Sequence, residues 1–172
     1  MIIRIATSAD AAQMAALLNE IIAIGGTTAH QTPFDADRMY HHYIGAPTQI
    51  CCHVAEQDGL ILGFQHLDGP DPDQSGAEGW GYIASFVATS AAGKGVGQQL
   101  FAATLKAARQ AGVQSINATI RADNTIGLRY YEGLGFIRFD VLRGVPLRDG
   151  QRVDRIVTRF DLDSPTSRDL KQ

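Results

Sequence analysis

The sequence has few cysteines, and this shortage already excludes several classes of protein. Only two occur among 172 residues, and they are neighbours, Cys51 and Cys52. Neighbouring residues of a strand point to opposite faces, so the pair cannot form an ordinary structural disulfide and does not resemble a set of metal ligands. We therefore expect a reduced, cytoplasmic protein without a bound metal.

Charge and long apolar runs are also scarce. Charged residues make up 19% of the chain, and the formal net charge is -3. Nucleic-acid-binding proteins usually carry a basic surface, so this balance argues against a nucleic-acid partner. No apolar run approaches the roughly 20 residues that span a bilayer, and the first residues do not resemble a signal peptide. We therefore expect no membrane association.

One long segment contains no acidic residue. No Asp or Glu occurs in residues 79–122, although Lys94, Lys106, Arg109 and Arg121 do. The plain interpretation is that buried strands and helices are apolar. The alternative is a site for an anion, which nearby carboxylates would repel.

Hydrophobic periodicity predicts an α/β protein in the order β-α-α-β-β-β-α-β-α-β-β. Asp58-Gly59 and Asp149-Gly150 are typical hairpin turns, and they separate pairs of strands. We expect both antiparallel and parallel strand pairs, a loop over residues 68–79, and a polar tail at residues 164–172. The expected strands are 2–6, 49–57, 60–67, 80–89, 113–120, 136–143 and 152–162, and the second helix is expected over 35–44.

A glycine-rich turn, Gly93-Lys94-Gly95-Val96-Gly97, follows an expected strand and opens a helix. Glycine lets the backbone approach a ligand, and the unpaired N–H groups of a first helical turn attract anions. Such a turn can cradle phosphate oxygens, with Lys94 as a cation at its mouth. It could equally serve only the packing of strand against helix. The spacing fits neither a Walker A loop nor a Rossmann fingerprint.

A second motif begins at Asn124 and ends with Tyr131-Glu132-Gly133-Leu134-Gly135-Phe136. Asn124 could cap a helix or bind a ligand. Tyr130 and Tyr131 lie on different faces of one helical turn, so we expect at most one of them to face a given site. A lone tyrosine in such a place is more often a core aromatic residue.

The two motifs at this spacing resemble those of the GNAT family, the Gcn5-related N-acetyltransferases. The family pattern is Q/R-x-x-G-x-G/A, followed by N-x-x-A-x-x-x-Y-x-x-x-G-F. The resemblance implies one N-acetyltransferase domain over residues 1–163, with a mixed, mostly antiparallel central sheet flanked by helices and with acetyl-CoA as co-substrate. Residues 19–34 more loosely resemble the phosphinothricin-acetyltransferase-like branch.

The resemblance also implies which residues bind acetyl-CoA. Backbone groups of a strand would hold the pantetheine arm, N–H groups of the glycine turn would hold the pyrophosphate, and Asn124 would lie near the pantetheine. The strand residues are Phe86, Val87 and Ala88, and the turn residues are Ala92, Gly93, Lys94, Gly95, Val96, Gly97 and Gln98. Ala92 stands where the family has Gln or Arg. Gly127 stands where the family has Ala, and we interpret this second difference as a tolerable loss of one methyl group.

Acetyl transfer to an amine requires a proton acceptor for the amine and benefits from a proton donor for the leaving thiolate. The resemblance places the Tyr131 hydroxyl beside the thioester sulfur, so Tyr131 is the expected acid. The backbone N–H near Val87 could stabilise the oxyanion.

The general base stays open among three residues. The phosphinothricin branch has a catalytic carboxylate where this chain has Tyr82. Glu78 precedes that strand, Glu20 lies on the first helix, and His30 lies in a loop that we expect to cover the acceptor.

The acceptor pocket is expected to be aromatic and mildly polar, drawing on Thr28, His30, Phe34, Trp80 and Tyr82. Such a pocket suits a small primary amine, for example an amino-acid-like or xenobiotic amine. One alternative is a protein N-terminal or lysine acetyltransferase, which would need an open groove. Another is a non-catalytic acyl-CoA-binding sensor, against which Tyr131 argues. A homodimer is compatible with the resemblance, although no feature of the sequence marks an interface.

Overall fold

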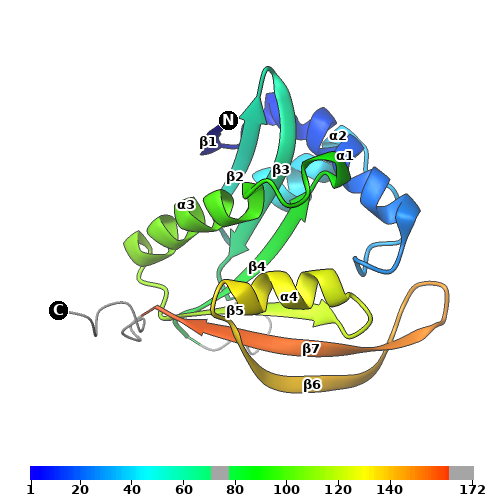
Figure 1. Cartoon of the computed structure of the whole chain (residues 1–172). Helices are drawn as coiled ribbons and strands as arrows, with labels where there is room; N and C mark the ends of the chain where they lie inside the picture. Colours follow the sequence, from blue (N-terminus) through cyan, green and yellow to red (C-terminus); the bar gives the residue numbers. More distant parts are fainter. Residues whose placement is uncertain (71–77, 163–172) are drawn as a thin grey trace.

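The structure, a computed structural model, describes residues 1–70 and 78–162. A seven-stranded sheet in the order β1-β2-β3-β4-β5-β7-β6 carries helices on both faces (Figure 1). The predicted α/β order and the mostly antiparallel sheet are confirmed, whereas the predicted tail and residues 71–77 of the predicted loop lie outside the described residues. The elements are β1 Ile2–Ile5, α1 Ala11–Ile24, α2 Ala36–Met39, β2 Gln49–Gln57, β3 Leu60–Asp68, β4 Trp80–Val87, α3 Val96–Gln110, β5 Ser115–Arg121, α4 Thr125–Gly133, β6 Ile137–Pro146 and β7 Arg152–Asp161.

The sheet divides between β4 and β5, the one parallel pair of neighbours among the described strands. These strands pair at only three positions, Trp80 with Ser115, Gly81 with Ile116, and Tyr82 with Asn117. Beyond these positions the described parts of β4 and β5 no longer pair with each other, although β4 stays paired with β3 and β5 with β7, and Figure 1 shows the two strands diverging. We call residues 83–87 of β4 and 118–121 of β5, which face one another without pairing, the β4–β5 split.

The two faces of the sheet bury separate apolar clusters. Cys51 belongs to the cluster under α3 and α4, whereas Cys52 belongs to the cluster under α1 and α2. The cysteines therefore point to opposite faces, as the sequence predicts, and both are free thiols. On the α1 side, Met14 and Leu18 pack with Phe64 of β3, and all three are fully buried.

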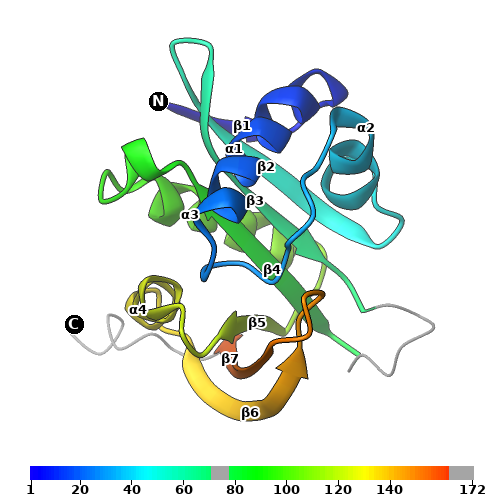
Figure 2. The same ribbon diagram turned by 90° about the vertical axis from the view of Figure 1, so that its right-hand side faces the viewer.

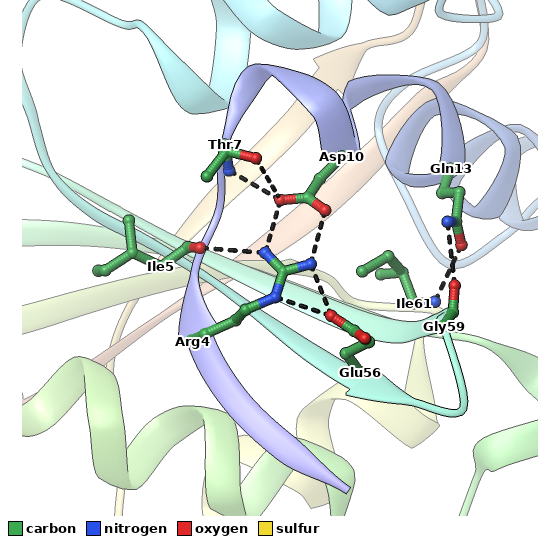
Figure 3. A network of polar contacts seen from close by, with 8 residues as sticks. All are labelled: Arg4, Ile5, Thr7, Asp10, Gln13, Glu56, Gly59 and Ile61. Atoms are coloured by element: carbon green, nitrogen blue, oxygen red, sulfur yellow. Dashed lines mark hydrogen bonds and ion pairs between the residues drawn. The ribbon is translucent and has the colours of Figure 1, made fainter.

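A network of ion pairs fixes the start of α1 against the sheet (Figure 3). The guanidinium of Arg4 donates two hydrogen bonds to Asp10, at 2.7 and 2.8 Å, and its Nε donates to Glu56 at 2.8 Å. The hydrogen bonds from Arg4 lower the pKa of Asp10 to about 2, against the opposing effect of burial. Gln13 bonds the backbone of the β2–β3 hairpin at Gly59 and Ile61, which holds the first turn of α1 to that hairpin.

The second helix differs in type from the prediction. Only Ala36–Met39 is α-helical, and Tyr40–Ile44 continues as a wider π-helical turn in which Tyr43 is buried. Asp35 caps the helix by accepting a 2.8 Å hydrogen bond from the backbone N–H of Arg38. Among the described residues, no helix combines the length and the apolar character needed to cross a bilayer.

Candidate active site

The glycine turn joins the end of β4 to α3. Gly93 and Gly95 have φ angles of +74° and +75°, a region that non-glycine residues avoid. The N–H groups of Ala92 and Lys94 are bonded within the turn. Within the described parts of the chain, no acceptor bonds the backbone N–H of Gly93, Gly95, Val96, Gly97 or Gln98. These groups, at the start of a 15-residue helix, can hold an anion.

The last residues of β4 present an unpaired backbone edge. The N–H of Ala88 donates to the carbonyl of Leu62 at 2.9 Å. Antiparallel pairing alternates, so the backbone groups of Phe86 also face β3, and those of Val87 face the β4–β5 split. Of the three predicted strand residues, Val87 is therefore the one whose backbone a ligand can reach.

Tyr131 reaches from α4 to β4. Its side chain is 7% exposed, and its hydroxyl lies 2.8 Å from the hydroxyl of Ser85. Burial raises the pKa of Tyr131, and the hydrogen bond with Ser85 acts in the opposite direction. The phenol is therefore protonated at neutral pH, as a proton donor must be.

Both tyrosines of the second motif meet one polar network. Gln65 of β3 donates from Nε2 to Ser85 at 2.8 Å and to the Tyr130 hydroxyl at 3.1 Å. The Tyr130 hydroxyl donates to the carbonyl of Gly97 at 2.8 Å, which ties α4 to the first turn of α3. The expectation that only one tyrosine faces a given site is therefore wrong, because the Tyr130 and Tyr131 ring centroids lie only 4.9 Å apart.

The sequence motifs did not point to Gln65 or Ser85. The available signal was a polar residue in the middle of the apolar strand β3, in which Gln65 is fully buried between Phe64 and His66. That Ser85 is the partner of Gln65 follows only from the pairing of β3 with β4, which places the two residues opposite each other.

Asn124 uses both ends of its amide within the protein. Its Oδ1 accepts a 2.8 Å hydrogen bond from the backbone N–H of Gly127, and its Nδ2 donates to the carbonyl of Thr27 at 2.9 Å. It therefore caps α4 and also holds the loop after α1. A Cβ atom on Gly127 would lie 2.5 Å from Nδ2 of Asn124, so the lack of a methyl group at Gly127 leaves room for the Asn124 amide to make both hydrogen bonds.

The loop over residues 25–34 crosses in front of β4, where Figure 2 shows it in blue near the β6–β7 turn. Arg121 of β5 donates to the carbonyl of Thr28 at 3.1 Å. Gln31 and Asp149 exchange two hydrogen bonds, at 2.8 and 3.0 Å. The loop is thus held to β5, to α4 and to the β6–β7 turn.

His30 lies in this loop, within a group of aromatic side chains. Its Nε2 is 2.7 Å from the hydroxyl of Tyr43, and its ring meets the buried Phe34 edge-on at 5.0 Å between centroids. The Phe86 ring of β4 lies 6.5 Å away. Three predicted residues, Phe86, His30 and Phe34, are therefore brought together, and Tyr43 joins them.

The environment of His30 disfavours a positive charge. Burial, with smaller contributions from His42 and Arg38, lowers the pKa of His30 to about 4. The imidazole is therefore neutral near pH 7, and the same burial makes it a weaker base than an ordinary histidine.

The other predicted residues lie apart from this group. Glu78 is exposed, and Glu78 and Trp80 line a separate pocket at the start of β4, about 20 Å along the strand from Ser85. The Trp80 ring packs against that of Phe139 at 5.9 Å between centroids, with the two planes tilted by 50°. Tyr82 occupies the last paired position before the β4–β5 split, and Glu20 is exposed on α1.

A sequence model described as the Acetyltransferase (GNAT) family matches residues 15–136. The chain belongs to the GNAT family. It is accordingly an acetyltransferase by family, and the members of this family use acetyl-CoA. No curated protein sequence matches the chain.

Solved structures share this GNAT fold. A ribosomal-protein-alanine N-acetyltransferase from Brucella melitensis is 24% identical, with a TM-score of 0.82 over 94% of this chain and 99% of that one. A putative acetyltransferase from Salmonella typhimurium, yncA, solved with acetyl-CoA, is 22% identical, with a TM-score of 0.82 over 97% and 96%. A putative phosphinothricin N-acetyltransferase is 23% identical, with a TM-score of 0.81 over 95% and 99%. At these identities the likeness shows the fold alone.

Proposed function

We propose that this GNAT protein transfers the acetyl group of acetyl-CoA to the primary amine of a small molecule, by direct attack of the amine on the thioester. One contact carries this proposal. The Tyr130 hydroxyl bonds the carbonyl of Gly97, which links the helix that bears Tyr131 to the turn with free N–H groups. A diphosphate held by that turn would leave the thioester within reach of the β4–β5 split.

The residues divide the chemistry among them. The free N–H groups of the glycine turn bind the diphosphate, and the Val87 backbone binds the pantetheine arm or the oxyanion. As the nitrogen–carbon bond forms and the carbon–sulfur bond breaks, the sulfur takes the electron pair and the hydroxyl hydrogen of Tyr131. The proton lost by the amine goes to a base or to water.

The two faces of β4 separate the acid from the acceptor. Ser85 points toward Tyr131, and the next residue, Phe86, points to the opposite face, where His30 lies. A thioester between the strands would therefore turn its sulfur toward Tyr131 and its carbonyl toward His30. This arrangement favours His30 as the base over Glu20 and Glu78, which are exposed and have no such contact.

The loop over residues 25–34 supports a small acceptor. It is tied to its neighbours by Asn124, Arg121 and Asp149, and it presents aromatic side chains to β4. A loop held over these side chains leaves more room for a small amine than for a polypeptide, which needs an open groove. A polypeptide acceptor is the second candidate, because a ribosomal-protein-alanine N-acetyltransferase shares the fold.

Calorimetry with CoA and acetyl-CoA, followed by a free-thiol assay with a panel of amino acids, small amines and peptides, tests this function. We expect acetyl-CoA binding and thiol release stimulated by one class of small amine. Release with peptides alone would favour the protein acetyltransferase, and binding without release across the panel would favour the sensor. Absence of binding would overturn the proposal.

A further inference from the structure

The hydrogen bonds around Ser85 run in one direction. The Tyr130 hydroxyl gives its hydrogen to the carbonyl of Gly97, so its oxygen accepts from Nε2 of Gln65. Ser85 accepts from the same nitrogen. Either hydroxyl of the 2.8 Å contact between Ser85 and Tyr131 can donate, and donation from Ser85 is the assignment that uses the remaining hydrogen of Ser85. The chain of donors therefore passes from Gln65 to Ser85 and from Ser85 to Tyr131.

The orientation of the Gln65 amide is fixed by these neighbours. If the amide were turned over, its carbonyl oxygen would face the Tyr130 oxygen, which has already given its hydrogen to Gly97. Two acceptors would then meet in the interior, because Gln65 is fully buried. In the observed orientation, Oε1 of Gln65 is buried without a partner among the described residues, a cost that the fold accepts.

Tyr131 is left with a hydrogen to donate. Its oxygen accepts from Ser85, and no second partner of this hydroxyl occurs in the described ranges 1–70 and 78–162. Its bonded partner Ser85 precedes Val87 on the strand edge that β5 leaves unpaired. An acceptor that enters the β4–β5 split can receive this hydrogen.

We propose that Gln65 and Ser85 are positioning residues that direct the Tyr131 hydroxyl hydrogen at the sulfur of the acyl thioester. This inference rests on the proposed function. When the carbon–sulfur bond breaks, the sulfur takes the bonding pair and this hydrogen. The phenolate that remains keeps the hydrogen bond from Ser85, and solvent returns a proton to Tyr131 after CoA leaves. Gln65 and Ser85 act through Tyr131 and do not touch the reacting atoms.

The test measures the thiol pKa of bound CoA, which needs neither an acceptor amine nor turnover. A pH titration of the complex, followed by the ultraviolet absorbance of the thiolate, gives this pKa. A hydrogen bond donated to the thiolate stabilises the charged form and lowers the thiol pKa. Burial raises the pKa of Cys51 to about 11 and of Cys52 to about 12, so neither thiol of the protein interferes near the titration of CoA.

Gln65→Glu reverses the direction of the network. Burial raises the pKa of a carboxyl at this position, so the comparison is made at alkaline pH, where the carboxyl is ionised and the thiol of CoA titrates. An ionised carboxylate only accepts hydrogen bonds, so Ser85 must donate to it and Tyr131 must donate to Ser85. We expect the thiol pKa of bound CoA to be about one unit lower in the wild type than in Tyr131→Phe, and Gln65→Glu to match Tyr131→Phe. Gln110→Glu makes the same chemical change at the exposed end of α3 and should leave the wild-type value.

A double variant separates positioning from general damage. Gln65→Glu should cause no further shift in a Tyr131→Phe background, because its effect passes through Tyr131. A further shift, or a wild-type pKa in Gln65→Glu, would overturn the inference. If Gln65→Glu does not fold, Ser85→Ala takes its place, with the same direction expected. A wild-type protein that does not bind CoA would instead contradict the proposed function.

Discussion

The hydroxyls of Tyr131 and Ser85 meet at 2.8 Å, and this contact joins α4 to β4 just beyond the point where β5 stops pairing with β4. The helix residue thus meets β4 on the α3/α4 face of the sheet, through the side chain of Ser85. The residue that we propose as the acid is therefore held next to the point where the pairing of β4 with β5 ends.

Tyr131→Phe should lower kcat by about 100-fold or more while leaving the Kd of acetyl-CoA unchanged, because it removes the proton donor and keeps the ring. The free-thiol assay and calorimetry measure the two quantities. Tyr40→Phe is the control, since Tyr40 is 37% exposed and remote from the network. Equal turnover in Tyr131→Phe and the wild type would remove Tyr131 from this role.

Gly97→Ala should weaken CoA binding and lower the free energy of unfolding by about 1–3 kcal/mol. Its Cβ atom would lie 2.6 Å from a ring carbon of Tyr130, so the ring must move away from the Gly97 carbonyl. Gly133→Ala is the matched control, because nothing lies within 4 Å of the new Cβ and alanine favours the helix by about 0.5–1 kcal/mol. Denaturant unfolding measures the free energy of unfolding, and calorimetry measures CoA binding. Equal values for Gly97→Ala and Gly133→Ala would contradict the prediction.

Gly127→Ala, which restores the residue typical of the family pattern, should not stabilise α4. The new Cβ would collide with the Asn124 amide, which must give up the cap of α4 or its hydrogen bond to the loop. We expect the variant to be at least about 1 kcal/mol less stable than Gly133→Ala, the usual value of a helix cap. Thermal or denaturant unfolding of the two variants measures the difference, and equal stability would show that Asn124 moves without cost.

The folded protein should lose stability as the pH falls from 6.5 toward 4. The pKa of His30 is about 4 in the folded state against 6.5 for an ordinary histidine, so the unfolded chain binds more protons in this window. His30→Gln should show a smaller loss over the same range in denaturant titrations. His42 and His53, whose pKa values are also lowered, contribute in the same direction in both proteins, so an unchanged slope would contradict the role of His30.

Asp10 acts at lower pH and does not confuse this measurement. Its pKa is lowered from 3.8 to about 2, so the stability that it contributes is present above 3.8 and is lost as the pH falls toward 2.

Local patterns predicted the parts of this protein that depend on neighbours in sequence. The glycine turn, the hairpins and the helix that begins after Asn124 follow from residues a few positions apart. The contacts of Gln65 with Tyr130 and of Asn124 with Thr27 join distant segments, and no local pattern specifies them. The sequence makes Glu78 a candidate base because it precedes the expected strand 80–89. In the structure, the extended strand β4 separates Glu78 from Ser85.

The three residue pairs between β4 and β5 are the shortest pairing between neighbouring strands of the described sheet. A ligand bound between these two strands would bind the folded state alone, and such binding raises the free energy of unfolding by mass action. The melting temperature of the whole protein would then report occupancy. The missing acceptor could be sought by heating the acyl-CoA-loaded protein against a library of amines, before any reaction is assayed.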